Sequence, residues 1–238
     1  MDKIKTTAII LAAGSGTRMG GPVKKQFMLL NDRPLLYYPL KVFEESFIDE
    51  IIIVASPEDK DFINREIVSK YGFKKVTNIV PGGEQRYDSV LCGLNAIDRC
   101  DYVFIHDGAR PMIDSKTLER GLDAVTKHDA CVIGVPSKDT VKIADEQNRV
   151  VSTPRRDLVW NIQTPQIFRF SLIKEAYNDV VGRAGEYKAQ GISITDDAMV
   201  LELYNDHDIR LVEGSYRNIK VTTPEDVILA ETFLKALD

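Results

Sequence analysis

The sequence predicts an α/β protein, built on an open, doubly wound and mostly parallel sheet with a projecting β-hairpin arm. Short apolar runs alternate along the 238 residues with longer segments of helical periodicity. Apolar runs without polar alternation are typical of parallel strands covered on both faces, and strands that alternate with helices are joined by βαβ crossovers. A polar segment with two short β-prone stretches, residues 139–153, interrupts this rhythm and predicts the arm.

Each element of the sheet has its own signal. Strands are expected at the apolar runs 7–11, 51–54, 102–105 and 131–135. Helices are expected between them, at roughly 35–46, 59–70, 86–98 and 115–127. In the third helix Val90, Leu94 and Ile97 share one face, which can pack against the sheet.

Two further elements follow these strands and helices. The arm has little apolar surface of its own, so we expect it to pack against another part of the protein or a second subunit. The last helix is predicted to begin after Thr223, with Pro224 in its first turn and Asp226 placed to complete a capping box. The chain shows no internal repeat or linker, which predicts a single domain over residues 1–238.

Composition excludes several classes of function. The 31 Lys and Arg residues against 36 Asp and Glu give a net charge of −5, which argues against a protein that binds nucleic acid through its phosphates. Cys92, Cys100 and Cys131 show no C-x-x-C pair and are expected to be free thiols in a reducing compartment. The apolar run 8–13 is too short for a membrane span or a signal peptide. We therefore expect a cytoplasmic protein that binds neither nucleic acid nor membranes.

The glycine-rich loop 12–21 directly follows the first predicted strand. In open α/β sheets ligands bind beyond the carboxyl ends of the strands, and small residues there let backbone N–H groups approach phosphate oxygens. Met19 stands where a dinucleotide fingerprint requires glycine, and Pro22 stands where a P-loop requires lysine. A tight turn is the alternative interpretation, but it needs fewer glycines. The loop predicts phosphate binding of another kind.

Charged residues near this loop suggest a polyphosphate ligand. Arg18 and Lys25 place two cations beside the loop, where they can stabilise charge that develops on phosphate oxygens. Asp107 follows the strand at 102–105, so its carboxylate can hold Mg²⁺ at the same edge of the sheet, although a helix cap is the alternative. His106 is expected to be a packed residue rather than a catalyst.

Other motifs have weaker signals. A second glycine turn, Gly82–Gly83, precedes a helix and can meet a base or ribose with Ser89, whereas Arg86 can equally be structural. The acidic residues of Thr195–Asp197 are typical of a helix first turn. Lys220 is expected on a short strand, 218–222, as a surface lysine. No serine, histidine and aspartate set and no zinc motif accompanies these residues.

The motifs together resemble one family. They are, in order, A-A-G-S-G-T-R-M-G followed by Lys25-Gln26, G-G-E-Q-R-Y-D-S-V, H-D-G-A-R-P, D-T-V-K, R-x-x-x-W with Q-T-P-Q, T-D-D and N-I-K-V-T-T-P-E-D. From about residue 6 to 230 the chain resembles the 2-C-methyl-D-erythritol 4-phosphate cytidylyltransferases of the non-mevalonate isoprenoid pathway. The resemblance implies a Rossmann-like sheet of the nucleotide-diphospho-sugar transferase type.

The resemblance also implies a reaction. CTP and 2-C-methyl-D-erythritol 4-phosphate would give 4-diphosphocytidyl-2-C-methyl-D-erythritol and pyrophosphate, with Mg²⁺ as cofactor. The acceptor's own phosphate would attack the α-phosphorus of CTP in line, so no protein nucleophile is needed. Arg18 and Lys25 would be catalytic, and Asp107 would bind the metal.

Binding residues can be carried over in the same way. The implied nucleotide-binding residues are Ala12, Ala13, Gly14, Gly16, Gly83, Ser89, Gly108 and Lys220. Those implied for the acceptor are Thr140, Arg156 and, again, Lys220. Gly108 stands where the family is expected to have alanine or serine, and the stretch 181–191 receives no role.

In this family the arm crosses to a second subunit. The resemblance therefore implies a homodimer in which residues 137–156 form the dimerisation arm and carry Thr140 and Arg156 into the partner's site. Two other functions remain open at this point. One is a ribitol-5-phosphate cytidylyltransferase, which tends to have A-G-G where this chain has Ala12-Ala13-Gly14. The other is a CTP-binding module without chemistry, which would be expected to lose Arg18, Lys25 or Asp107.

Overall fold

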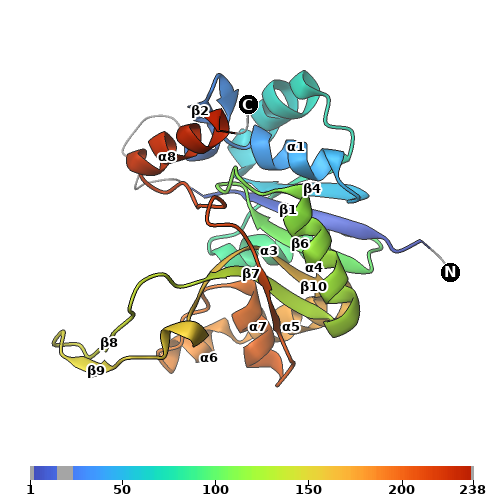
Figure 1. Cartoon of the computed structure of the whole chain (residues 1–238). Helices are drawn as coiled ribbons and strands as arrows, with labels where there is room; N and C mark the ends of the chain where they lie inside the picture. The colour runs from blue at the N-terminus through green and yellow to red at the C-terminus, as the bar shows by residue number, and fades with distance from the viewer. Residues whose placement is uncertain (1–2, 15–23, 237–238) are drawn as a thin grey trace.

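A seven-stranded sheet organises the computed structural model, which describes residues 3–14 and 24–236 (Figure 1). The strand order is β11-β7-β10-β6-β1-β4-β5. The strands are β1 (Thr6–Ala12), β4 (Glu50–Ala55), β5 (Val76–Pro81), β6 (Tyr102–Asp107), β7 (Ala130–Pro136), β10 (Trp160–Arg169) and β11 (Arg210–Glu213). Only β10 runs antiparallel to its neighbours, β6 and β7. The prediction of a mostly parallel sheet is confirmed.

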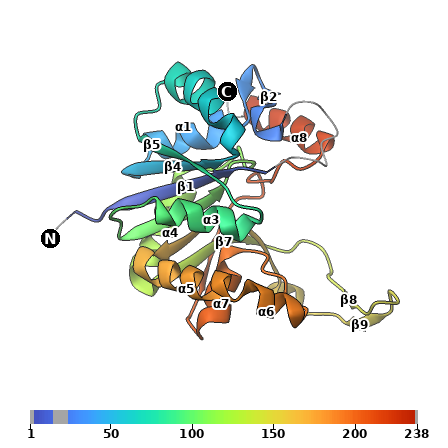
Figure 2. The ribbon, with the colours of Figure 1, turned by 180° about the vertical axis from the view of Figure 1, so that it is seen from behind.

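Helices cover both faces of this sheet. One face carries α1 (Tyr37–Glu45), the short α2 (Lys60–Phe62) with the π-helical segment η4 (Ile63–Ser69), and α4 (Ser115–His128). Figure 2 shows the other face, covered by α3 (Arg86–Asn95), α5 (Phe170–Gly182) and α7 (Asp197–Tyr204). Neighbouring residues of a strand point to opposite faces, so Ile9 packs under α3 while Ile10 packs under α1. The sheet is doubly wound, as predicted.

The structure differs from the predictions at several elements. The four predicted strands and the four predicted helices are present, but β5, β10 and β11 were not expected from the sequence. The short strand predicted at 218–222 is wrong, because this stretch has no ladder partner in the described part of the chain and is held by single bonds such as Val221 N–H to the Ala109 carbonyl, 2.8 Å. The stretch 181–191 contains a short helix, α6 (Ala184–Ala189).

The remaining elements are short. They are η2 (Lys25–Phe27), the pair β2 (Leu29–Leu30) and β3 (Arg33–Pro34), η3 (Pro57–Asp59) and η5 (Arg156–Leu158). The last helix, α8 (Pro224–Lys235), begins with the predicted capping box of Thr223 and Asp226. Its Ala230 packs with Leu30 and Val221 in a small separate core. Among helices of the described residues, none is both long and apolar enough to span a bilayer.

The arm projects away from the body of the protein (Figure 1). It ends in the antiparallel pair β8 (Ile143–Ala144) and β9 (Val150–Ser152), which confirms the predicted hairpin. Every residue of both strands is exposed, and Val151 keeps 66% of its surface accessible. Within this chain the arm therefore lacks the apolar packing that supports the other strands.

Gly93 sets how closely α3 approaches the sheet, and α3 carries several residues of the site described below. A Cβ at this position would lie 2.8 Å from Ile9 Cγ2 and 3.1 Å from Val54 Cγ2. Both contacts are made by β-branched side chains, which have little rotamer freedom. Glycine therefore lets the helix lie against β1 and β4.

We expect Gly93→Ala to lower the free energy of unfolding by about 1–3 kcal/mol, because the added methyl group overpacks this contact. Gly182→Ala is the matched control: Gly182 ends α5, and a Cβ there would have no neighbour within 4 Å. The control should leave stability unchanged or raise it by up to about 1 kcal/mol. Urea unfolding measures both, and equal effects of the two changes would contradict the close approach.

Candidate active site

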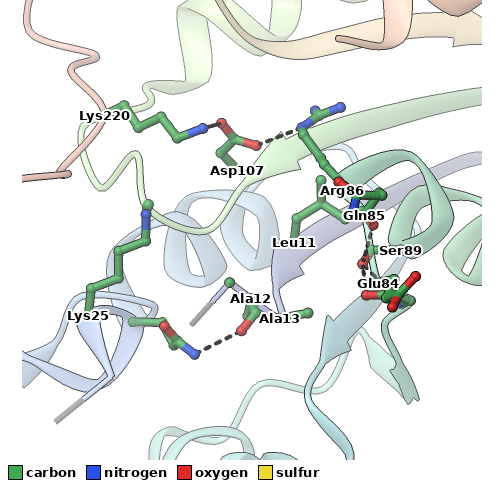
Figure 3. Close-up of a pocket in the computed structure, with 14 residues that line it drawn as sticks. Leu11, Ala12, Ala13, Lys25, Glu84, Gln85, Arg86, Ser89, Asp107 and Lys220 are labelled. Carbon is green, nitrogen blue, oxygen red and sulfur yellow. Dashed lines mark hydrogen bonds and ion pairs between the residues drawn. The ribbon is translucent and has the colours of Figure 1, made fainter. Parts of the chain in front are cut away.

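A pocket opens at the carboxyl ends of β1 and β6, where an open α/β sheet is expected to bind its ligand. It has a volume of about 380 Å³. Figure 3 shows the residues around it, which come from the ends of both strands, the start of α3 and two loops. They are Leu11, Ala12, Ala13, Gly14, Lys25, Gln26, Gly83, Glu84, Gln85, Arg86, Ser89, Asp107, Ala109 and Lys220. We call this pocket the first cavity.

The end of β1 is fixed by side chains from other segments. Gln26 is buried and donates through Nε2 to the Ala12 carbonyl at 2.9 Å. Ser56 Oγ donates to the Ala13 carbonyl at 3.3 Å. These bonds satisfy the backbone carbonyls where the strand stops, so the small residues at 12–14 line the cavity in a defined conformation.

The second glycine turn packs directly against the first loop. A Cβ on Gly82 would lie 2.6 Å from Ala13 Cβ and 2.8 Å from Ser89 Oγ, so a larger residue would push the two loops apart. Ser89 Oγ accepts the Gly83 N–H at 3.1 Å and lies 3.2 Å from the Gln85 carbonyl, to which it donates. A capping box of Gln85 and Asp88 starts α3 at this point. The turn is held by its own side chains.

Asp107 ends β6 with a carboxylate surrounded by cations. Lys220 Nζ lies 2.7 Å from Oδ2, Arg86 Nε lies 3.5 Å from Oδ1, and Arg110 Nε lies 3.9 Å from Oδ2. Burial raises the pKa of the Asp107 carboxyl, but the charges of Arg86 and Lys220 outweigh burial and hold that pKa well below its usual range. Asp107 is therefore ionised at neutral pH.

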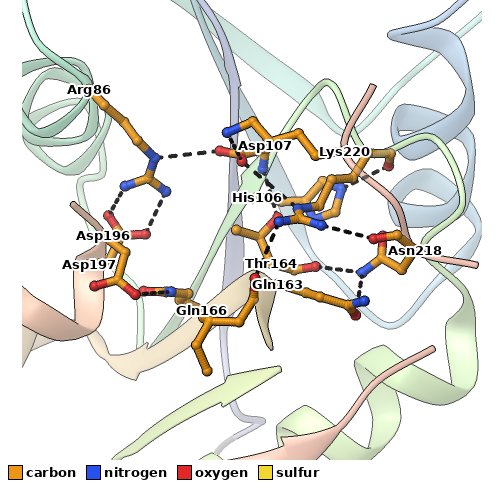
Figure 4. A network of polar contacts seen from close by, with 12 residues as sticks. Arg86, His106, Asp107, Gln163, Thr164, Gln166, Asp196, Asp197, Asn218 and Lys220 are labelled. Atoms are coloured by element: carbon orange, nitrogen blue, oxygen red, sulfur yellow. Dashed lines mark hydrogen bonds and ion pairs between the residues drawn. The ribbon is translucent and has the colours of Figure 1, made fainter. Parts of the chain in front are cut away.

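His106 is a buried residue that packs at this strand end, and contacts within the protein occupy both of its ring nitrogens. The ring is fully buried, with Nε2 3.2 Å from the Arg110 carbonyl and Nδ1 3.1 Å from Thr164 Oγ1 (Figure 4). Burial lowers the pKa of His106 to about 4, so the ring is neutral at pH 7. A neutral ring that donates from Nε2 and accepts at Nδ1 satisfies both contacts. The interpretation of His106 as a packed residue agrees with this geometry.

Arg86 joins Asp107 to the start of α7. Its Nη1 and Nη2 lie 2.7 and 2.8 Å from the two carboxylate oxygens of Asp197, a bidentate pair (Figure 4). Asp196 caps α7 by accepting the Met199 N–H at 2.9 Å, so the capping prediction holds for that residue. Asp197 instead points inward and is completely buried.

A second cavity, of about 240 Å³, shares a wall with the first. Arg86, Asp107 and Lys220 line both cavities. The second is also lined by Arg110, Ile162, Gln163, Thr164, Gln166, Thr195 and Asp196. Two of its neighbouring polar atoms, Arg110 Nε and Asn218 Oδ1, are buried with no hydrogen-bond partner among the described residues. The lining holds three cationic side chains, Arg86, Arg110 and Lys220, beside the carboxylates of Asp107 and Asp196, so charges of both signs face this cavity.

The structure brings together most of the residues predicted from the sequence. Ala12, Ala13, Gly14, Lys25, Gly83, Ser89, Asp107 and Lys220 all line the first cavity. Lys25 reaches it from η2, and its ammonium group points toward the side that holds Asp107 (Figure 3). Gly108 does not line the cavity, but its neighbour Ala109 does. A Cβ on Gly108 would lie 2.9 Å from the Leu11 carbonyl oxygen.

The other predicted residues lie elsewhere. Gly16 and Arg18 fall outside the described residues. Thr140 and Arg156 are exposed on the arm and line neither cavity. Lys220, expected as a surface lysine from its own sequence context, instead pairs with Asp107 and lines both cavities.

Sequence reasoning missed several residues of the site. Arg86 was left open as structural, and Arg110, Gln85 and Thr164 were given no role. Arg86 lies three residues after Gly83, and Arg110 lies three residues after Asp107, so both stood within recognised motifs. Thr164 also lay within a quoted motif, Q-T-P-Q, but its place beside Asp107 was missed because β10 was not predicted.

The site can be tested for a divalent metal ion. Within residues 3–14 and 24–236 no three His, Cys, Asp or Glu side chains form a cluster that could hold one. Mg²⁺ is commonly bound by one or two carboxylates together with substrate phosphates. The ionised Asp107 at the wall of a cationic cavity fits that donor set, provided that a polyphosphate supplies the other oxygens.

The fold and these cavities are typical of a nucleotidyltransferase: small residues line the end of β1, Arg86, Asp107 and Lys220 form a charged wall, and a second cavity adjoins the first. The family model of 2-C-methyl-D-erythritol 4-phosphate cytidylyltransferase matches residues 6–236. The chain therefore belongs to the 2-C-methyl-D-erythritol 4-phosphate cytidylyltransferase family.

Relatives support this assignment over nearly the whole chain. A protein of that name from Lachnoclostridium phytofermentans is 50% identical over 231 residues, which are 97% of each chain. One from Alkaliphilus oremlandii is 45% identical, covering 97% of this chain and 95% of its own. The solved structure of a 4-diphosphocytidyl-2C-methyl-D-erythritol synthase from Anaerococcus prevotii is 36% identical, has a TM-score of 0.82, and covers 98% of this chain and 99% of its own.

We expect Ser89→Ala to raise the KM for the nucleotide about fivefold with little change in kcat, since one lost hydrogen bond contributes about 1 kcal/mol to holding the turn. Ser46→Ala is the matched control. Its hydroxyl also accepts a backbone N–H and donates to a carbonyl, but at the end of α1, away from both cavities. Steady-state kinetics should show no change in KM for the control. An unchanged KM for Ser89→Ala would contradict the role of this turn.

Proposed function

We propose that this chain transfers the cytidylyl group of CTP to 2-C-methyl-D-erythritol 4-phosphate. The products are 4-diphosphocytidyl-2-C-methyl-D-erythritol and pyrophosphate, a step of the non-mevalonate isoprenoid pathway. The observation that carries the proposal is the wall of Arg86, Asp107 and Lys220 between two adjoining cavities. It lets two anions, a triphosphate and an acceptor phosphate, bind next to one another.

The first cavity is assigned to CTP. The ends of β1 and of the second glycine turn offer small residues against which a nucleotide can lie, and Ser89 keeps that turn in place. Lys25, with Arg18, is assigned to stabilising the charge that builds up on the phosphates as the bond to pyrophosphate breaks. These roles predict a loss of kcat rather than of CTP affinity when either cation is removed.

The second cavity is assigned to the phosphate of the acceptor. Lys220 and Arg110 line it, and the buried Arg110 Nε, which makes no hydrogen bond among the described residues, offers a donor. An acceptor phosphate already carries negative charge, so it needs no base to become a nucleophile. This agrees with the neutral, buried His106. The protein's part is to hold two anions in line while its cations offset their repulsion.

Mg²⁺ completes the proposed site. Asp107 would hold it together with oxygens of the CTP phosphates, and bound there it would supply Lewis-acid stabilisation of phosphate charge. The charges of Arg86 and Lys220 outweigh burial and keep Asp107 ionised, which is the state that a metal ligand needs. The cytoplasmic location expected from the sequence belongs to this proposal as well.

The acceptor is tested by pyrophosphate release from CTP and Mg²⁺, with either 2-C-methyl-D-erythritol 4-phosphate or ribitol 5-phosphate. We expect release with the first acceptor only. If ribitol 5-phosphate alone supports release, the acceptor assignment is wrong, whereas the assignment of the nucleotide site stands. No release with either would contradict the proposed reaction. Asp107→Asn serves as the control that assigns the activity to this site.

The arm is assigned to a homodimer in which residues 137–156 of one subunit reach the site of the other. The exposed Val150 and Val151 of the arm, and Leu158 just after it, support this, since each keeps more than half of its surface accessible in the single chain. Thr140 and Arg156 lie on the arm outside both cavities. In an arm-exchanged dimer they would contact the acceptor in the partner's second cavity.

This arrangement predicts complementation between two inactive variants. Lys25→Ala and Arg156→Ala should each lose most of their activity alone. A mixed dimer has one site with both residues intact, so equal mixing after subunit exchange should restore about a quarter of the wild-type rate. If Arg156 acts within its own chain, mixing restores nothing. Sedimentation or light scattering before and after mixing confirms that the dimers have formed.

A further inference from the structure

Asp197 is a buried carboxylate to which neither the capping of α7 nor the proposed chemistry assigns a role. Its side chain is completely inaccessible to solvent. It accepts hydrogen bonds from both terminal nitrogens of Arg86, on α3, and from the hydroxyl of Tyr177, on α5. Burial raises the pKa of Tyr177, so the hydroxyl is protonated and donates. A charge placed this deep is costly unless it is fully paired, and here it is.

The pair fixes how the Arg86 guanidinium lies. Its planar group presents donors in a rigid fork, and Asp197 occupies both Nη1 and Nη2. The edge that carries Nε is therefore left facing Asp107, at 3.5 Å from Oδ1. Figure 4 shows Arg86 between the two carboxylates. Arg86 touches Asp107 with one donor and cannot turn its fork toward it.

This orientation matters because Arg86 and Asp107 lie in the wall between the two cavities. A guanidinium free to rotate would pair bidentately with Asp107 or with an incoming phosphate, since both match its fork. Either pairing would take Asp107 out of position. Helix capping does not explain Asp197, because Asp196 already accepts the Met199 N–H.

We propose that Asp197 is a positioning residue for the reaction: it holds Arg86 edge-on, so that Asp107 keeps its orientation between the nucleotide and the acceptor. The inference rests on the proposed function, since it assigns Asp107 to the reacting phosphates. Its specific consequence is that the charge of Asp197 serves turnover through Arg86 and contributes little to binding CTP itself.

The test is Asp197→Asn, which keeps the shape of the side chain and removes its charge. We expect kcat to fall by about 100-fold, the effect of a misplaced reacting group. Calorimetry without metal should show nearly unchanged CTP affinity. Asp49→Asn is the matched control, because Asp49 also accepts several hydrogen bonds, including the Thr6 N–H at 3.0 Å, but at the opposite end of β1. It should lower thermal stability and leave kcat unchanged.

A second variant separates positioning from folding. Asp197→Asn takes away the bidentate ionic partner of the half-buried Arg86, so the single variant is expected to be less stable. The double variant Arg86→Gln, Asp197→Asn removes both charges. It should regain stability but not kcat, because no side chain then steadies Asp107. A double variant that recovers wild-type kcat would overturn the proposal. So would a loss of CTP affinity in Asp197→Asn, measured without metal, that equals its loss of kcat.

A readout without turnover separates this inference from the proposed reaction. Calorimetry with and without Mg²⁺ measures how far the metal increases the affinity for CTP. We expect Asp197→Asn to lose much of the gain that the wild type and Asp49→Asn show. If Mg²⁺ increases the CTP affinity of the wild type but no product forms, the proposed reaction fails. The positioning role of Asp197 is still tested in that case, by comparing the Mg²⁺-dependent increase in affinity between Asp197→Asn and the wild type. A full gain in Asp197→Asn would overturn positioning.

Discussion

The carboxylate of Asp107 is the constraint around which the site is arranged. It lies at the buried end of β6, where an anion without partners would be very unfavourable, and so it draws cations from three separate segments. Arg86 arrives at the start of α3, Arg110 from the loop after β6, and Lys220 from the stretch before α8. Holding one charge at a strand end thereby ties one helix and two loops to the same edge of the sheet.

The local signals of the sequence predicted the parts of this arrangement that depend on neighbours in the chain. Apolar runs predicted the buried strands, and the capping residues of α8 were correct to the residue. The antiparallel β10 was missed, since its pairing with β6 and β7 depends on partners far away in the sequence and its ladder is interrupted between Ile162 and Gln166. Thr164, which contacts His106 and Asp107, was lost with it.

The same limit explains which charges were misread. Arg86 and Asp197 are separated by 111 positions, and nothing in either segment alone distinguishes a buried pair from a surface arginine and a capping carboxylate. Lys220 looked like a surface lysine for the same reason. In each case the missing information was the tertiary contact, whereas residue type and local pattern had already been used. The family resemblance implied a site role for Lys220, because the motifs of a family carry tertiary information implicitly.

Arg86 and Lys220, the two cations closest to Asp107, differ in how firmly they are held. This difference fits a site that is proposed to bind two anions, one in each cavity. Arg86 is held by a bidentate pair to a buried carboxylate, so its position is set before any ligand arrives. Lys220 carries a compact charge on a flexible stem, and its side chain remains 37% exposed. An incoming phosphate can therefore draw the ammonium group of Lys220 away from Asp107 while Arg86 stays in place. A rigid cation preserves the orientation of the carboxylate, and a movable one lets the same wall serve both cavities.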